Sequence, residues 1–316
     1  MCIRDRVYTG TSSDPDTCPS SAYFADGTVF VADPCGNDYY GEIRTFNPTT
    51  WAQGPPITTV FYDPAFMVQG TDGNLYVTNF GYGLVSVVNP TTGAFVKYFE
   101  TCYYYPDYLD VQTSTGVVYI GDLYAGWYHY FGENPRDGCM DAYNIGSGTD
   151  TIIVLSNAAG TGYGSATGVS VNQENGYVYA VDSFSYFEGT TNNVYLISGT
   201  SQTGNLTLSS NGFQPWGSAY DAANHDVLVV ISEDDTCSGF CGGFQSISSA
   251  NVVSSSIIDT GLGPSNACYN SGRVVTIPNY DTEAPAYATN VKADFALKQV
   301  DLNNFGYIGP GGCGGS

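Results

Sequence analysis

The amino-acid sequence predicts an all-β fold: a β-propeller of six blades, each a four-stranded antiparallel sheet. A short apolar strand that follows a glycine and ends in Asn or Asp recurs at residues 28–33, 75–79, 117–122 and 177–182. The spacing of these strands, roughly 40–50 residues, is typical of propeller blades. No stretch shows the 3.6-residue apolar period of an amphipathic helix, so helical folds are not expected.

The expected blades begin in a similar way, which supports the count. The openings are at Pro19, Pro64, Pro106, Ala166, Pro215 and Pro264. Seven blades are the alternative, if the N-terminal and C-terminal segments together form a further one. Residues 1–6 resemble a translated sequencing-adaptor segment and are set aside. Residues 7–316 are expected to form a single propeller domain, because no linker or change of composition divides them.

The strands are expected in chain order. In the first blade they are 22–25, 28–32, 42–46 and 57–61, and the second blade extends to about residue 101. The third has strands near 108–111, 117–122, 140–145 and 151–156, with a long insertion at 123–138. The later blades have strands near 167–171, 177–181, 193–197, 206–209, 217–220, 227–231, 244–247, 255–259, 266–269, 273–277, 295–302 and 307–308. Residues 228–231 are apolar at successive positions, which indicates a strand covered on both faces.

The segment Tyr76-Val77-Thr78-Asn79 resembles the YVTN family of β-propeller repeats, and the likeness continues through residues 80–93. This family is common in secreted and surface-layer proteins, especially of archaea. The resemblance implies a propeller of that type but no particular activity, because propellers host many. The polar residues that end the second strands are expected to cap the turns that follow, as Asx side chains do in such repeats. They are Asp33, Asn79, Asp122, Asp182 and Asn279.

Charge excludes several partner classes. The chain has 8 Lys and Arg against 30 Asp and Glu, a net charge of −22, so nucleic acid and anionic membranes are not expected partners. No apolar run is long enough to span a membrane. Charged residues make up only 12% of the chain, and there are 27 Tyr. Such a composition suits acid, high salt, or a surface that is covered in an assembly.

Cysteines indicate an oxidising compartment. Setting Cys2 aside leaves an even number without zinc-type spacing, so disulfides and an extracellular or cell-surface location are expected. Cys18–Cys35 and Cys102–Cys139 are the expected pairs, since each pair joins loops on the same face of a propeller. The pairing of Cys237, Cys241, Cys268 and Cys313 is left open. Asn205 lies in an Asn-Leu-Thr sequence and is a candidate N-glycosylation site.

The sequence offers little catalytic chemistry. No catalytic residue or cofactor is assigned, and neither of the two imidazoles, His129 and His225, has an obvious Ser/Cys–Asp setting. Asp107 and Asp110 are the only acids near the strands expected to line the channel. No metal site is assigned, although a calcium ion in an acidic loop remains an alternative. The protein is therefore expected not to be an enzyme; a calcium-dependent lactonase-like hydrolase is the second alternative.

Aromatic residues gather in the long loops between second and third strands, which would open on one face of the propeller. They are Tyr124, Trp127, Tyr128, Tyr130, Phe131, Phe184, Tyr186, Phe187, Phe240, Tyr280 and Tyr287. Aromatic residues with few charges are typical anchors of protein interfaces. The expected function is a secreted structural propeller that assembles with itself into an extracellular filament or surface layer. The first alternative is a cell-surface adhesin that binds glycans.

Overall fold

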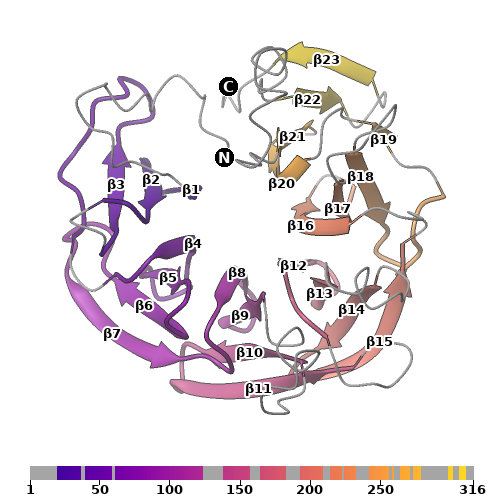
Figure 1. Ribbon diagram of the computed structural model, residues 1–316, viewed down its shortest axis with the longest axis horizontal. Coiled ribbons are helices and arrows are strands. Elements are labelled where there is room, and N and C mark those ends of the chain that lie inside the picture. The colour runs from indigo at the N-terminus through magenta and orange to yellow at the C-terminus, as the bar shows by residue number, and fades with distance from the viewer. Residues whose placement is uncertain are drawn as a thin grey trace, which may run out of the picture.

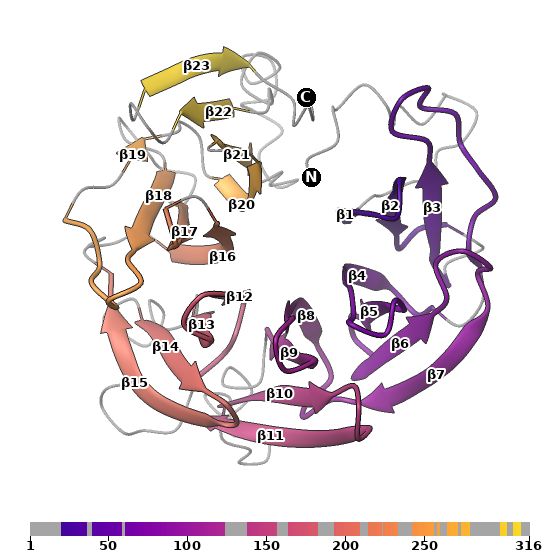
Figure 2. The same cartoon turned by 180° about the vertical axis from the view of Figure 1, so that it is seen from behind.

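The computed structural model is a ring of antiparallel β-sheets around a central axis (Figure 1). It describes residues 20–36, 40–58, 61–123, 138–156, 164–182, 193–208, 214–222, 224–232, 242–255, 258–259, 264–270, 273–278, 298–301 and 306–310. Strands β4, β8 and β12 lie near the axis, and β7, β11 and β15 lie on the outside, as the view from behind also shows (Figure 2). The predicted β-propeller is confirmed.

Each four-stranded blade is a meander in which consecutive strands pair. The first such blade consists of β4 (Pro64–Gln69), β5 (Leu75–Asn79), β6 (Leu84–Val88) and β7 (Phe95–Glu100). The second consists of β8 (Pro106–Gln112), β9 (Val117–Asp122), β10 (Gly138–Asn144) and β11 (Thr149–Leu155). The third is β12 (Gly168–Val171), β13 (Tyr177–Asp182), β14 (Asn193–Ser198), β15 (Ser201–Thr207). The fourth consists of β16 (Gln214–Asp221), β17 (Asp226–Ser232), β18 (Gly242–Ile247) and β19 (Ile258–Asp259). The fifth consists of β20 (Pro264–Asn270), β21 (Arg273–Pro278), β22 (Lys298–Asp301) and β23 (Gly306–Pro310).

The predicted count of six four-stranded blades, with seven as the alternative, is wrong. The described residues form five four-stranded blades, and the remaining sheet has three strands: β1 (Ser21–Ala25), β2 (Thr28–Asp33) and β3 (Glu42–Phe46). Of the fourth strand expected at 57–61 the structure describes residues 57, 58 and 61, and these make an isolated bridge, Ile57 with Ile43; a second bridge joins Gln53 to Phe46. Two consecutive prolines, Pro55 and Pro56, lie between these bridges. Because proline has no N–H and a fixed φ, it interrupts a continuous ladder.

A cavity of about 380 Å³ lies beside this interrupted segment, lined by Thr45, Pro55 and Ile57 together with residues 90–93 of the β6–β7 turn.

A smaller difference from the sequence prediction concerns the β12–β15 blade, whose last strand is expected at 206–209 and is found at Ser201–Thr207. Strands β14 and β15 are joined by only two residues, the first of which is Gly199 with φ of 59°. Glycine is favoured in such two-residue hairpin turns, which brings the next strand forward in the sequence.

The first strand of four blades contains the same irregularity. The pairing with the second strand shifts by one residue after Pro64, Pro106, Pro215 and Pro264. Such a β-bulge lets the strand begin with a proline and turns the next carbonyl out of the ladder. In two blades that carbonyl accepts a hydroxyl of the preceding sheet: Thr78 Oγ1 donates to the Asp107 oxygen at 2.7 Å, and Thr167 Oγ1 to the Trp216 oxygen at 3.3 Å. In the β4–β7 blade, Ser20 Oγ donates to the Ala65 oxygen at 2.9 Å. The bulges therefore join neighbouring sheets near the axis.

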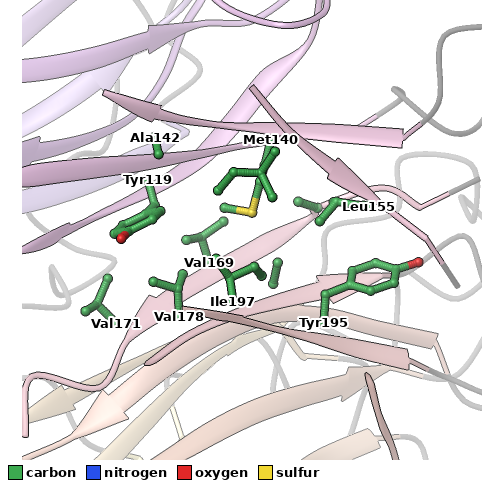
Figure 3. Close-up of a cluster of buried hydrophobic side chains, with 12 residues drawn as sticks. Tyr119, Met140, Ala142, Leu155, Val169, Val171, Val178, Tyr195 and Ile197 are labelled. Atoms are coloured by element: carbon green, nitrogen blue, oxygen red, sulfur yellow. The ribbon is translucent and has the colours of Figure 1, made fainter. Parts of the chain in front are cut away.

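The core consists of layers of side chains between neighbouring sheets. Figure 3 shows the layer between the β8–β11 and β12–β15 blades, where Met140 and Leu155 of one blade face Val169, Val178 and Ile197 of the other. Met140, Leu155, Val178 and Ile197 have no exposed surface, and Val169 is 4% exposed. Burying one side chain of this size contributes roughly 1.5–3 kcal/mol. Sheets stack side by side in this way because strands such as β5 and β13 bury their side chains on both faces and so need a neighbour on each side.

In the described part of the chain, no helix has both the length and the hydropathy needed to cross a membrane.

Candidate interaction face

One face of the ring carries the starts of the first and third strands and the ends of the second strands, because the strands of each sheet alternate in direction. In the β4–β7 blade, for example, Pro64 pairs with Asn79, and Asn79 with Leu84. We call this face the loop face. All eleven aromatic residues predicted to form an interaction face lie outside the described residues: Tyr124, Trp127, Tyr128, Tyr130, Phe131, Phe184, Tyr186, Phe187, Phe240, Tyr280 and Tyr287. Their role stays a prediction.

The described residues of the loop face carry a different group of aromatic side chains. Tyr40 precedes β3, Tyr62 precedes β4, and Tyr82 lies in the β5–β6 turn. The ring centroids are 6.0 Å apart for Tyr40 and Tyr62, and 4.9 Å apart for Tyr62 and Tyr82. Exposed fractions are 59% for Tyr40, 37% for Tyr62 and 54% for Tyr82. Three segments distant in sequence thus bring their tyrosines together on the surface.

The segment that leads into β8 adds three more tyrosines. Tyr103 contacts Tyr104 and Tyr105, with ring centroids 5.3 and 6.4 Å away, and Tyr104 is 63% exposed. Backbone bonds tie this segment to the β5–β6 turn: Gly83 N–H donates to the Tyr104 oxygen at 3.0 Å, and Thr101 N–H to the Gly83 oxygen at 2.9 Å. We call Tyr40, Tyr62, Tyr82, Tyr103, Tyr104 and Tyr105 the tyrosine ridge.

Glycine is required where these two segments meet. Gly83 has a φ of 65°, a left-handed conformation that favours glycine. A Cβ at this position would lie 2.9 Å from the Tyr103 oxygen. The absence of a side chain therefore lets the turn that holds Tyr82 approach the backbone of Tyr103 and Tyr104.

Two of the predicted turn-capping residues hold the backbone of ridge tyrosines. Asn79 Oδ1 accepts the Tyr62 N–H at 2.8 Å, and Asp122 Oδ2 accepts the Tyr105 N–H at 3.0 Å. Both side chains are fully or almost fully buried. The amide of Asn79 also donates to the Leu84 oxygen at 3.2 Å, across its own β-hairpin. These polar strand ends position the segments that lead into β4 and β8, and capping of the following turns stays a prediction.

Equivalent side chains in other sheets are also buried and bonded. Asp182 accepts the hydroxyl of Ser165 at 2.7 Å, and it accepts a second hydroxyl from Tyr195. Asp33 lies 2.8 Å from the guanidinium Nε of Arg44. Asn279 lies outside the described residues. A polar side chain at the end of the second strand is thus a repeated structural element of the loop face.

Three acids, Asp63 next to Tyr62 of the ridge and Asp107 and Asp110 of β8, have carboxyl groups with raised pKa values. Burial and the neighbouring Asp122 and Asp63 raise the pKa of Asp107 to about 7. Burial also raises the pKa of Asp63. Further along the same strand, burial raises the pKa of Asp110 to about 6, although the N–H groups of Val171 and Val111 oppose the shift. Asp107 and Asp110, singled out in the sequence as the acids nearest the channel, are therefore the perturbed carboxyls of β8.

The described residues contain no group of three His, Cys, Asp or Glu side chains arranged to hold a metal ion. The calcium alternative therefore gains no support from the described part of the chain. His129 lies outside that part. His225 lies in the β16–β17 turn, with Nδ1 3.2 Å from Glu174 and 3.2 Å from the Tyr220 hydroxyl. That turn joins the end of a first strand to a second strand, so it lies on the face opposite the loop face.

The structure contains the predicted disulfide between Cys102 and Cys139, with Cα atoms 6.3 Å apart. It ties the segment that leads into β8 to strand β10. Cys35 is also disulfide-bonded. Its expected partner, Cys18, lies outside the described residues, as do Cys237, Cys241, Cys313 and the side chain of Cys268, so those pairings stay predictions.

The candidate glycosylation residue Asn205 is half-buried in the outer strand β15. Its side-chain nitrogen donates to the Ser156 oxygen of the neighbouring blade at 3.2 Å, and its oxygen accepts from Gln202 Nε2 at 2.5 Å. A glycan on Asn205 would have to displace the bond to Ser156. Glycosylation there stays a prediction.

A second exposed apolar surface lies on the outer strands. Five residues there have more than two fifths of their surface exposed: Phe95, Val96, Tyr98, Ile152 and Val154, at 41%, 46%, 62%, 56% and 51%. The first three belong to β7 and the last two to β11, which follow one another around the outside of the ring (Figure 1). We call these five residues the apolar rim. The sequence carried a signal for it, because residues 152–155 are all apolar although an outermost strand needs only one apolar face.

No protein-family model matches the chain, and no curated protein matches its sequence. Solved structures do match. Hydrazine synthase of Kuenenia stuttgartiensis aligns with a TM-score of 0.67 at 13% identity, covering 94% of this chain and 80% of that one. A streptogramin B lyase aligns at 0.63 and 13% identity, covering 92% and 82%. Virginiamycin B lyase from Staphylococcus aureus aligns at 0.54 and 12% identity, covering 84% and 92%.

These similarities support the propeller fold and no more, because the identities are low. They do not show membership of the YVTN family. They include enzymes, so the expectation that this chain is not an enzyme stays a prediction.

Proposed function

We propose that this chain is a non-enzymatic structural propeller that assembles with further copies of itself outside the cell, as a filament or surface layer. The observation that carries the proposal is the presence of two exposed apolar surfaces in different places on one molecule. The tyrosine ridge lies on the loop face, and the apolar rim lies on the outside of the ring.

A second copy is the occupant that suits the ridge. Tyrosine buries a large, rigid area and keeps a hydroxyl that can still find a partner, so it suits a protein interface. The net charge of −22 disfavours an anionic partner, and it also opposes contact between two copies of this chain unless salt screens it or acid protonates the carboxylates. The apolar rim of another copy offers a surface of matching chemistry. Contact between two different surfaces is heterologous, and it grows into an open chain unless the rotation between copies closes it into a ring.

The cysteines support the proposed location outside the cell. The Cys102–Cys139 disulfide and the oxidised Cys35 support a protein that folds in an oxidising compartment. The low share of charged residues, 12%, supports assembly, because few charged groups have to lose water when copies meet.

Size measurements on purified protein test this proposal. We expect large assemblies by light scattering and regular particles by negative-stain microscopy. A ridge variant with Tyr40→Ser, Tyr62→Ser and Tyr82→Ser should be monomeric, and so should a rim variant with Val96→Ser, Tyr98→Ser and Ile152→Ser. The matched control is Val252→Ser, since Val252 is 63% exposed and belongs to neither surface. It should assemble like the wild type.

Mixing the two variants sharpens the test. Each ridge variant retains an intact rim, and each rim variant retains an intact ridge, so an equal mixture should form one-to-one dimers and no longer species. If the ridge instead pairs with the ridge of another copy, the rim variant alone forms dimers. If wild-type protein stays monomeric at high concentration across salt and from pH 4 to 8, self-assembly is refuted. Binding of neutral polysaccharides to the ridge would then favour the adhesin alternative.

One observation favours a second candidate, an enzyme that uses Asp107 for proton transfer. A carboxyl with a pKa of about 7 beside a channel is typical of a general acid or base. The two lyases of similar fold suggest a first substrate to try, a compound of the streptogramin B class. Cleavage by the wild type that is lost in Asp107→Asn would support this candidate, and no cleavage by either would count against this substrate class.

A further inference from the structure

Asp63 and Asp107 lie at the base of the tyrosine ridge. The carbonyl of Asp63 accepts the Phe80 N–H at 2.8 Å, and the carbonyl of Asp107 accepts the Thr78 hydroxyl at 2.7 Å. The two acids thus flank the end of β5. Phe80 is directly next to this end, and its ring lies 5.2 Å from that of Tyr105 in the ridge.

Each acid is also adjacent to a ridge residue along the chain. Asp63 follows Tyr62 and has a left-handed φ of 58°, so the chain turns sharply between the tyrosine and β4. Asp107 is separated from Tyr105 only by Pro106. Both residues keep part of their surface exposed. A partner seated on the ridge would remove them further from water.

The charged groups that face these acids carry negative charge. Asp122, at the end of β9, and Asp63 both act on Asp107, and the Tyr108 hydroxyl is the neighbouring titratable group on β8. Among the side chains that the structure describes, the Lys and Arg cations lie elsewhere: Arg44 contacts Asp33 and Glu42 of the three-stranded sheet, and Lys97 contacts Tyr143. Neither of these two cations offsets the charge of Asp63 and Asp107.

We propose that self-association through the tyrosine ridge is gated by protonation of Asp63 and Asp107, so that copies assemble in mild acid and separate as the pH rises. This inference rests on the proposed function, since it concerns the regulation of the same surface.

The direction of the effect follows from desolvation. Covering a charged carboxylate without a partner is unfavourable, whereas covering a neutral carboxyl group that can donate a hydrogen bond is much less so. The pKa of Asp107 is already about 7 in the free protein, and association raises it further, as it does for Asp63. The assembled state therefore binds more protons than the free state. Its association constant rises as pH falls, by at most about tenfold per pH unit for each carboxyl involved.

The experiment measures the association constant by analytical ultracentrifugation from pH 5 to 8. For wild-type protein we expect a steep fall with rising pH, up to about a hundredfold per pH unit if both carboxyls take up a proton. Asp63→Asn with Asp107→Asn should associate at pH 8 as strongly as the wild type does at pH 5, with little dependence on pH. Asp72→Asn is the matched control: Asp72 is an exposed acid in the β4–β5 turn on the opposite face, and its removal should leave the wild-type pH profile unchanged.

Repeating the series in 1 M salt separates this gate from general repulsion between copies of charge −22. Salt screens exposed charges to within about 3 Å but acts little on desolvated ones, so the pH dependence should persist. If circular dichroism shows that Asp107→Asn does not fold, Asp63→Asn is tested alone. It should remove about half of the slope of the logarithm of the association constant against pH. If the association constant of the wild type does not depend on pH, or if that of the double variant changes with pH as the wild type's does, the proposed control by protonation is overturned and the proposed function is not. Absence of association at every pH overturns the proposed function as well.

Discussion

The β8–β11 blade meets its surroundings in two physically different ways. Towards the β12–β15 blade it presents a dry layer of apolar side chains, centred on Met140 (Figure 3). At its loop-face end it is held by polar and covalent links around Asp141. The Cys102 N–H donates to both carboxylate oxygens of fully buried Asp141, at 3.1 and 2.9 Å, and Cys102 is bonded to Cys139 on the same strand as Asp141.

The two regions differ in how their contribution to stability depends on pH: the apolar layer should contribute equally at every pH, whereas the links around Asp141 should not. Apolar packing has no titrating group. Burial and the neighbouring Asp150 raise the pKa of Asp141 well above its usual range, and the two carboxyl groups are hydrogen-bonded to each other. One end of the blade should therefore respond to protons and the other should not.

The largest expected effect is on the apolar side. Met140→Ala removes a fully buried side chain and leaves a cavity, so the free energy of unfolding should fall by about 2–5 kcal/mol. Urea denaturation at pH 5 and at pH 8 measures it, and the loss should be equal at both. A loss confined to one pH would show that the layer is coupled to the carboxyl pair.

The disulfide gives the next effect. Replacing Cys102 and Cys139 by Ser opens a loop with a sequence separation of 37, which should lower the free energy of unfolding by about 3–4 kcal/mol in the chain-entropy view. Thermal denaturation of the double Ser variant checks this, with reduced wild-type protein as the matched sample. A variant as stable as the oxidised protein would mean that the bonds from Asp141 hold the segment without the disulfide.

The Thr78 hydroxyl, which joins the β4–β7 and β8–β11 blades, should contribute less to the free energy of unfolding. Thr78→Val keeps the shape of the side chain but leaves the Phe66 N–H and the Asp107 oxygen without their partner. We expect a loss of about 1–3 kcal/mol in denaturant unfolding. Thr91→Val, in the exposed β6–β7 turn, is the control and should change little. An unchanged midpoint for Thr78→Val would mean that water replaces the hydroxyl.

The carboxyl pair gives the smallest and most informative effect. The folded protein keeps a proton between Asp141 and Asp150 that the unfolded chain releases at neutral pH. This contribution is fully present below the unfolded pKa of about 4 and is lost as pH rises through the higher folded value. Asp150→Asn supplies a permanent donor in place of that proton, so the Tm at pH 8 should rise by roughly 1–3 °C and its pH dependence should weaken. A lower Tm at pH 8 would contradict the shared proton.

Much of the fold could be predicted because each blade repeats the same local signals. A glycine before an apolar strand and an Asn or Asp at its end give the second strands, and Leu75–Asn79 lies where it was expected. The apolar run at 57–61 predicts a fourth strand, but Pro55 and Pro56 directly before it interrupt the ladder, and the described residues there form only an isolated bridge. The prolines decide the outcome, since side-chain patterning cannot restore a missing N–H.

The tyrosine ridge could not be predicted in the same way. Tyr40, Tyr62 and Tyr82 are about twenty residues apart in the sequence, in three separate connections, and only the register of the strands brings them together. The aromatic residues of the long loops are close to one another in the sequence, so sequence patterning predicts an interaction face there and not at the ridge. The sequence identifies Asp107 as an acid near the channel, but its raised pKa results from burial and from the neighbouring Asp122 and Asp63, and all of these depend on the tertiary structure.

The β-bulge at the start of a blade has a consequence for modularity. Thr78, Thr167 and Ser20 each donate to a carbonyl in the first strand of the next sheet. Thr78 lies in a second strand, whereas Thr167 and Ser20 directly precede a first strand. In each case the hydrogen bond links two sheets and crosses the boundary between the units that repeat in the sequence. A duplication or exchange of one sequence repeat would carry away a hydroxyl from one joint and a carbonyl from another. Blades of this ring can be swapped without loss only between positions whose neighbours offer the same hydroxyl.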